Sequence, residues 1–125
     1  MYADLDFVLA ICKTDDWLKE KAARIYNEHK NEIWTSNLTV QEALLYAKKH
    51  ALEPSIIVQA IYYAFEVRPI RFSRENYLEI AEIMREHGAT PFDAMHAIAA
   101  KEDGTIISSD DMYDRIGLKR IKLEE

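Results

Sequence analysis

Short hydrophobic runs alternate along the chain with longer amphipathic or apolar segments, and turn or capping residues separate them. Runs of this length are typical of strands, and hydrophobic residues spaced by three or four are typical of helices. We expect strands at residues 2–6, 32–36, 67–71, 105–108 and 119–122. The intervening segments predict a short apolar helix ending near Cys12 and further helices at about 15–30, 39–51, 54–65, 75–87 and 90–101, with a helical turn at 111–115.

Capping residues mark the starts of several of these helices. Thr14 and Asp15 offer an N-cap for the helix at 15–30. The buried side of that helix is expected to comprise Trp17, Leu18, Ala22, Ile25 and Tyr26. The segment Thr39-Val40-Gln41-Glu42 has the pattern of a capping box, which would make Thr39 the N-cap of its helix. Pro69 interrupts the third strand and predicts that this strand lies at a sheet edge.

Strands that alternate with helices predict an α/β fold. We expect a three-layer α/β/α sandwich with a central, mostly parallel five-stranded sheet covered by helices on both faces. The chain of 125 residues has no linker, repeat or low-complexity segment, which predicts a single domain over residues 1–125. In such sheets, ligands bind at the carboxyl ends of the strands, where the strand order reverses. Catalytic residues should therefore follow strands or begin helices at that edge.

Composition narrows the classes of function. A single cysteine, Cys12, excludes an internal disulfide and a cysteine-based zinc site. No apolar run is long enough to span a membrane and no signal peptide precedes the first strand, so we expect a cytoplasmic protein without a membrane partner. The net charge of −6 argues against broad, nonspecific binding to polyanions. It remains compatible with local basic patches, or with acids gathered around a metal ion.

Acidic residues occupy the positions where this architecture places its chemistry. Asp4 and Asp6 end the first strand, Glu42 and Asp93 take the third position of their helices, and Asp110 follows the fourth strand. Each alone could be a polar strand end or a helix cap, and helix N-termini should keep such carboxylates ionised. Several converging carboxylates repel one another unless a divalent cation holds them, and oxygen ligands without histidine or cysteine suit Mg²⁺ or Mn²⁺. The pattern predicts metal-dependent hydrolysis of a phosphodiester or phosphoester.

Four segments resemble motifs of a known family. They are Ala3–Leu9, Thr35–Glu42, Phe92–Ala100 and Ile106–Asp110. With them, nearly the whole chain resembles a PIN domain, and in size and layout it is similar to the VapC-type toxin ribonucleases. The resemblance implies that the acidic metal ligands are Asp4, Glu42, Asp93 and Asp110. It also implies a magnesium- or manganese-dependent endoribonuclease, commonly a homodimer, with RNA as substrate and, for a toxin, an antitoxin protein as partner.

Further residues could assist these four acids. They are Asp6, Ser36, His96, Ser108, Asp111 and Asp114. Asp6 stands where the family usually has asparagine, so it could bind metal, orient water or do neither. Ser36 and Ser108 could orient a carboxylate or a water molecule. His96 is expected to be a packed, hydrogen-bonded histidine rather than a ligand, and Asp111 and Asp114 could have no role beyond their helical turn.

Two other functions remain open at this stage. Asp4-Leu5-Asp6-Phe7-Val8 also resembles the nucleophile motif of haloacid-dehalogenase-type phosphatases, in which Asp4 would attack phosphorus and Asp6 would act as general acid. That alternative needs Lys101 as its lysine, which is a weak match, and it leaves Glu42 and Asp93 unexplained. A catalytically degenerate module that binds RNA or protein is the other alternative.

The helix at 54–65 is apolar around most of its circumference, more than one buried face requires. The excess predicts a surface for a homodimer partner or an antitoxin helix, unless neighbouring loops bury it. An RNA substrate also needs cations near the acidic pocket. The sequence offers several without indicating which lie there: Lys13, Lys48, Lys49, Arg68, Arg71, Arg74 and Arg115.

Overall fold

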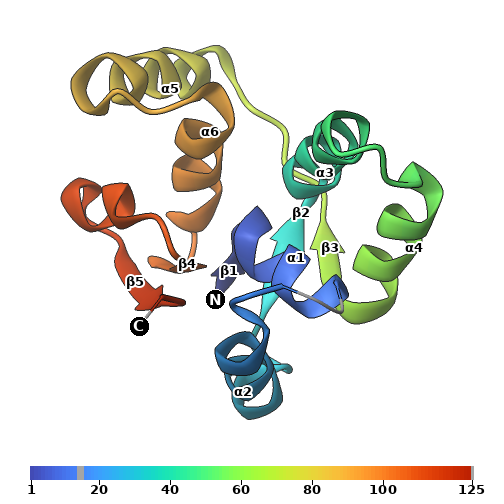
Figure 1. Ribbon diagram of the computed structural model, residues 1–125. Coiled ribbons are helices and arrows are strands. Elements are labelled where there is room, and N and C mark those ends of the chain that lie inside the picture. Colours follow the sequence, from blue (N-terminus) through green and yellow to red (C-terminus); the bar gives the residue numbers. More distant parts are fainter. Residues whose placement is uncertain (14–15, 125) are drawn as a thin grey trace.

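The structure, a computed structural model, describes residues 1–13 and 16–124 (Figure 1). Five strands form one sheet in the order β3-β2-β1-β4-β5, and every neighbouring pair is parallel. The strands are β1 (Tyr2–Ala3), β2 (Trp34–Ser36), β3 (Glu66–Arg68), β4 (Thr105–Ser108) and β5 (Lys119–Lys122). The strand order reverses between β1 and β4, because the chain fills one side of β1 before crossing to the other. This is where ligands bind in such sheets.

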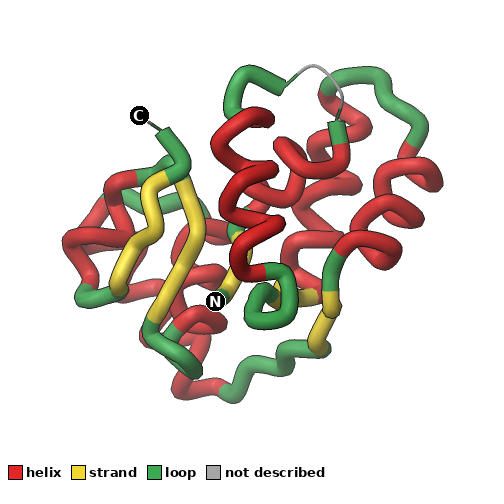
Figure 2. The backbone as a smooth tube through the Cα atoms, turned by 90° about the horizontal axis from the view of Figure 1, so that it is seen from below, coloured by secondary structure: helices red, strands yellow, loops and turns green. Residues whose placement is uncertain are grey.

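Helices cover both faces of the sheet, which confirms the predicted α/β/α sandwich (Figures 1 and 2). The helices are α1 (Leu5–Cys12), α2 (Lys19–His29), α3 (Asn37–Lys49), α4 (Pro54–Ala64), α5 (Arg74–His87), α6 (Pro91–Ala100) and the 3₁₀ helix η1 (Asp111–Ile116). Successive strand residues point to opposite faces. Ala3 and Ile107 therefore join the core under α1, α2 and α4, whereas Tyr2 and Ile106 join the core under α6 and η1.

The first strand is shorter than predicted, because Asp4 ends it and begins α1. Asp4 has an extended backbone (φ −74°, ψ 167°), and its N–H still donates to the carbonyl of Ile107 in β4 at 3.2 Å. Its side chain accepts from the N–H of Leu5 at 2.8 Å, as an N-cap does. The predicted strand at 2–6 is therefore wrong beyond Ala3, and Asp6 lies in the first turn of α1.

The predicted capping box at Thr39 is also wrong. Ser36 is the N-cap of α3, and its hydroxyl accepts from the N–H of Leu38 at 3.2 Å. Thr39 is buried and bonds to Thr35, whose hydroxyl donates to it at 2.7 Å. The N-cap thus lies three residues earlier than predicted, and Glu42 lies in the second turn of the helix, past the first-turn N–H groups that a capping carboxylate reaches. Glu42 needs another explanation.

Helix α2 begins later than predicted. Residues 17 and 18 form a turn in which the N–H of Leu18 donates to the carboxylate of Asp16 at 2.9 Å, and the helix follows from Lys19. Leu18, Ala22 and Ile25 are buried as expected, but the prediction for Trp17 is wrong, since its side chain is 80% exposed. The predicted N-caps Thr14 and Asp15 lie outside the described residues.

The edge position predicted for the third strand is confirmed: β3 lies at a sheet edge, although Pro69 follows it rather than interrupting it. Gly88 ends α5 with a positive φ of 66°, which glycine adopts readily. Thr90 caps α6 through a bond from the N–H of Asp93 at 3.2 Å. Within the described residues, no helix combines the length and the apolar character that crossing a membrane requires.

The apolar excess of α4 lies at the surface. Ile61 is the buried residue of this helix, whereas Ile56, Tyr62 and Tyr63 are 66%, 57% and 95% exposed. Neighbouring loops therefore do not bury these side chains. An exposed apolar face of this kind is typical of contact surfaces between proteins.

Candidate active site

Four acids that are far apart in the sequence line one cavity of about 490 Å³. They are Asp4, Glu42, Asp93 and Asp110, the same four that the family resemblance singled out. Asp4 follows β1, Glu42 lies on α3, Asp93 lies in the first turn of α6 and Asp110 follows β4. The cavity therefore opens at the carboxyl edge of the sheet, beside the reversal of strand order. Its remaining lining residues are Leu5, Asp6, Leu9, Tyr46 and Ser109.

Asp4 is the most enclosed of the four acids, with 6% of its surface exposed. One carboxylate oxygen accepts from the N–H of Leu5, and the other accepts from the hydroxyl of Ser108 at 2.8 Å. Burial raises the pKa of Asp4, and the negative charge of Glu42 adds to this, while the charge of His96 opposes it. Asp4 is a fixed, buried carboxylate whose charged form is disfavoured by burial, and such a group is suited to bind a cation.

Ser108 joins the two acids that follow the central strands. Its hydroxyl donates to Asp4 and also accepts from the N–H of Asp110 at 3.0 Å. Asp110 in turn caps η1, because its Oδ1 accepts from the N–H of Met112 at 2.9 Å. The predicted assisting role of Ser108 thus has a geometric basis, since one hydroxyl fixes the spacing between β1 and the end of β4.

Asp93 is half-buried at the start of α6. Burial raises the pKa of its carboxyl group, and the negative charges of Asp110 and Glu42 raise it further, whereas Thr90 and His96 lower it. Burial and repulsion from neighbouring acids thus act against the stabilisation that helix N-termini give to the charged forms of Asp93 and Asp4.

His96 orients Glu42 from within the core. The histidine is fully buried, and its Nε2 lies 2.8 Å from Oε1 of Glu42 and 3.7 Å from Oδ1 of Asp4. An ionised carboxylate only accepts hydrogen bonds, so Nε2 carries the proton that it donates to Glu42. Burial alone would lower the pKa of His96, but Tyr2, the bond to Glu42 and the charge of Asp4 outweigh it and hold the pKa well above its usual value.

A hydrogen-bonded chain continues behind His96. Its Nδ1 lies 2.6 Å from the hydroxyl of Tyr2, which lies 2.8 Å from the hydroxyl of Ser36. The predicted packed histidine is what the structure shows, and Ser36 reaches the site through this chain rather than directly. His96 therefore stands directly behind the acids, although the sequence argument for Mg²⁺ or Mn²⁺ considered only oxygen ligands. Tyr2 was missed because its hydrophobic strand position indicates a core residue and nothing more.

Asp6 also lines the cavity and holds the loop after β4. Its Oδ2 accepts from the N–H of Ser109 at 2.8 Å and from the Ser109 hydroxyl, while its Oδ1 is buried without a hydrogen-bond partner among the described residues. Burial and the charge of Asp4 raise the pKa of Asp6 to about 6. Asp6 therefore ties α1 to the segment that carries Asp110.

Two other candidate acids lie outside the cavity. Asp111 is exposed and lies 3.7 Å from Arg115, and Asp114 is exposed and pairs with Arg120 at 3.0 Å. Lys101, which the phosphatase alternative requires, pairs with Glu79 on α5 instead of an acid of the cavity. The geometry therefore gives the phosphatase alternative no support.

The residues of the cavity fit a divalent cation. Asp4 and Glu42 of the lining and the buried His96 each present one ligand atom, and these three atoms lie within 4.8 Å of one another; Asp93 and Asp110 line the cavity but do not join this group. Both ring nitrogens of His96 already have hydrogen-bond partners, which leaves the carboxylates as the ready ligands. Carboxylate oxygens favour hard cations such as Mg²⁺ and Mn²⁺. Burial is the main cause of the raised pKa values of Asp4 and Asp93, and a cation there would favour their charged forms and also relieve the repulsion between the acids.

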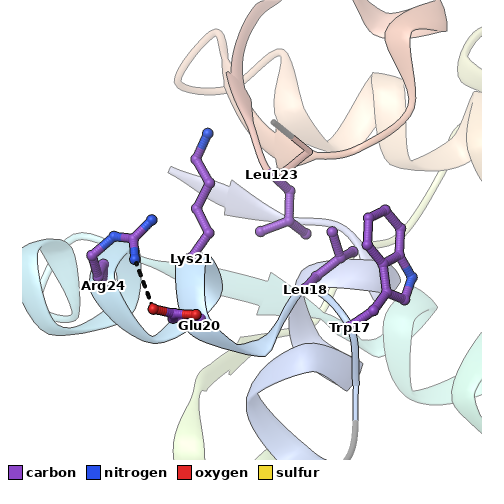
Figure 3. A pocket seen from close by; sticks show the side chains of 6 residues that line it. All are labelled: Trp17, Leu18, Glu20, Lys21, Arg24 and Leu123. Carbon is purple, nitrogen blue, oxygen red and sulfur yellow. Dashed lines mark ion pairs between the residues drawn. The ribbon is translucent and has the colours of Figure 1, made fainter.

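A second cavity, of about 330 Å³, lies between the start of α2 and the C-terminal segment (Figure 3). It is lined by Trp17, Leu18, Glu20, Lys21, Arg24 and Leu123. Arg24 lies 3.8 Å from Glu20, and the lining includes none of the four acids. This cavity offers no comparable set of ligands.

Comparison with known proteins agrees with this geometry. The sequence model of the PIN domain family matches residues 1–119, and the chain belongs to this family. PIN domains are generally nucleases. Among curated proteins, none matches the chain in sequence. A chain in the structure described as FitAB bound to an IR36 DNA fragment is similar, with a TM-score of 0.67 and 16% identity over 98% of this chain and 94% of that one. At this identity the likeness shows the fold alone.

Proposed function

We propose that this PIN domain is a metal-dependent endoribonuclease. The observation that supports this most strongly is the convergence of Asp4, Glu42, Asp93 and Asp110, from four separate elements, on one cavity. Asp4 and Asp110 also cap helices, but Glu42 lies beyond the capping positions of α3 and accepts a bond from a buried histidine on another helix. Convergent carboxylates with raised pKa values are typical of functional sites.

The four acids would hold Mg²⁺ or Mn²⁺, which supplies an activated water and neutralises the charge that develops on the phosphoryl group. Ser108 and the N–H of Leu5 hold Asp4, which limits its freedom to turn away from the cavity. His96 does the same for Glu42. In this proposal Asp93, which is half-exposed, would accept a proton from the attacking water.

The test compares the wild type with Asp93→Asn on single-stranded and structured RNA, in Mg²⁺, Mn²⁺ or EDTA. We expect cleavage by the wild type in either metal and none in EDTA, with the variant reduced by at least about 100-fold. Asp111→Asn is the matched control, because it removes an exposed acid outside the cavity. Binding without cleavage in every condition would instead indicate a non-catalytic module. Hydrolysis of small phosphate monoesters with an adduct on Asp4 would indicate the phosphatase.

We further propose that the protein is the toxin of a toxin–antitoxin pair. The exposed apolar side chains Ile56, Tyr62 and Tyr63 of α4 offer a surface that an antitoxin helix or a second copy could cover. Expression of the wild type should arrest growth, and expression of Asp93→Asn should not. Growth that is unaffected by active enzyme would refute the toxin role while leaving the nuclease intact.

A further inference from the structure

We infer that Lys13, Tyr46 and His50 form a subsite that binds the single-stranded RNA beside the bond that is cleaved. The inference rests on the proposed nuclease function and identifies where its substrate lies. Lys13 directly follows α1, Tyr46 lies on the last turn of α3, and His50 is the C-cap residue that directly follows α3.

The need for such a subsite follows from the charge of the cavity. Among its lining residues the four proposed ligands and Asp6 are acidic, and the lining includes no lysine or arginine. The whole chain carries a net charge of −6. A polyanionic substrate is therefore repelled unless a cation stands at the edge of the cavity. The sequence offers several cations but does not indicate which of them is close.

Tyr46 lines the cavity and also contacts such a cation. It lies one helical turn beyond Glu42, on the same side of α3. Nζ of Lys13 donates to the Tyr46 hydroxyl at 2.8 Å and lies 5.2 Å from the centre of its ring. Of the cations proposed from the sequence, Lys13 is thus tied to a residue of the cavity wall.

His50 extends the surface by one further turn. Its ring centre lies 4.1 Å from that of Tyr46, with the two planes inclined by 33°. Glu42, Tyr46 and His50 are spaced by four residues, so they form a row along α3 that starts at the acids and ends at an exposed histidine. Lys13 lies beside the middle of this row.

The chemistry of this row selects a single strand. Aromatic rings bind unpaired bases by stacking, and an adjacent ammonium group binds the backbone phosphate. Bases within a duplex are already stacked on one another and cannot use these rings. The row therefore fits a nucleotide next to the scissile phosphate in unpaired RNA.

A purely structural role for Lys13 and Tyr46, joining α1 to α3, makes a different prediction. In that case their replacement would lower thermal stability without changing affinity for RNA in the protein that remains folded. The experiment must therefore measure binding directly, apart from cleavage. Asp93→Asn protein in Mg²⁺ serves this purpose, because the proposed function predicts that it binds RNA without cutting it.

The probe is a short fluorescein-labelled oligouridine, and its binding is followed by anisotropy across a salt series. Adding Tyr46→Ala should weaken binding roughly 5- to 100-fold. Adding Lys13→Gln should reduce the slope of log affinity against log salt by about 0.7, the share of one phosphate contact on a single strand. Tyr46→Phe keeps the ring and removes the hydroxyl that holds Lys13, so it should keep most of the affinity and guards against a misfolded alanine variant.

The matched control is Lys48→Gln, which removes the same charge from an exposed position on α3. If Lys13→Gln and Lys48→Gln alter affinity and salt slope equally, the subsite is refuted. The subsite is also refuted if Tyr46→Ala binds the oligouridine as tightly as the parent protein and as Tyr46→Phe does. It is refuted as well if the substitutions weaken the binding of a blunt RNA duplex as much as they weaken the binding of the single strand. Failure of the nuclease proposal would appear separately, as an absence of cleavage by the wild type.

Discussion

At the scale of single residues, Ser108 positions two of the proposed metal ligands with one small side chain. Its hydroxyl is bonded to Asp4 on one side and to the N–H of Asp110 on the other. Ser108→Ala should therefore lower metal affinity and cleavage by about 10- to 100-fold, the usual effect of losing a group that orients a ligand. Because the partly buried N–H of Asp110 and the carboxylate of Asp4 both lose a hydrogen-bond partner, the free energy of unfolding should fall by about 1–3 kcal/mol.

Calorimetric titration with Mn²⁺ measures the first effect and urea unfolding the second. Ser55→Ala, which removes an exposed hydroxyl at the start of α4, is the control for both. Metal affinity equal to that of the wild type in a folded Ser108→Ala protein would show that Asp4 and Asp110 hold their positions without this serine.

At the scale of elements, the start of α3 decides the role of Glu42. Ser36 caps this helix, so Ser36→Ala should lower the free energy of unfolding by about 1–2 kcal/mol. Glu42→Gln should leave stability close to that of the wild type, because it removes both the repulsion from Asp4 and Asp93 and the charge that favours protonated His96, and it keeps an oxygen for the bond from His96. Urea unfolding of both variants without added metal checks this. Unchanged stability in Ser36→Ala would contradict the cap at Ser36, and a large loss in Glu42→Gln would show that Glu42 supports the fold rather than the site.

These boundaries show what the sequence could predict about the fold. The alternation of strands and helices depends on the whole hydrophobic pattern, so it was robust, and the sheet and its layers followed from it. Helix starts depend on a choice between neighbouring residues that are both competent to cap. Ser36 and Thr39 are such a pair, and the burial of Thr39 against Thr35, which decides between them, is a tertiary contact. Trp17 was misplaced for the same reason, since local spacing cannot show where a turn at Asp16 delays the helix.

Only part of the candidate site could likewise be predicted from the sequence. The rule that parallel strands gather ligands at their carboxyl edge was enough to expect Asp4 and Asp110 together. The contacts that orient them join residues far apart in the chain, as when Ser108 bonds to Asp4 across 104 positions or Tyr2 reaches His96 across 94. These long-range contacts form only in the assembled sheet, so the sequence does not indicate them. For Tyr46, the four-residue spacing from Glu42 was the one weak local signal.

At the scale of the whole molecule, the acid cluster couples stability to pH and to metal. Burial raises the pKa of Asp93 in the folded protein above the value of 3.8 that an unhindered aspartate has. The folded state therefore binds protons more readily than the unfolded state, so this group's contribution to stability falls as the pH rises through its folded pKa. Without divalent cations, Asp93→Asn should then have a higher Tm than the wild type at about pH 7, and the difference should shrink near about pH 4.

Added Mn²⁺ should reverse this order. A cation that binds the folded state and not the unfolded state raises the free energy of unfolding of the wild type, by about 2.7 kcal/mol when its concentration is 100 times its dissociation constant. The Tm of the wild type rises accordingly. Asp93→Asn lacks one proposed ligand and should gain less, so its advantage at about pH 7 should become a deficit. Thermal unfolding over a pH series, with EDTA or Mn²⁺, measures both. Asp111→Asn should follow the wild type throughout, because its exposed carboxylate faces Arg115. If Asp93→Asn is less stable than the wild type even in EDTA, the Asp93 carboxylate stabilises the fold and is not destabilised by burial and by the neighbouring acids. That result would remove the electrostatic reason for placing a cation among the four acids.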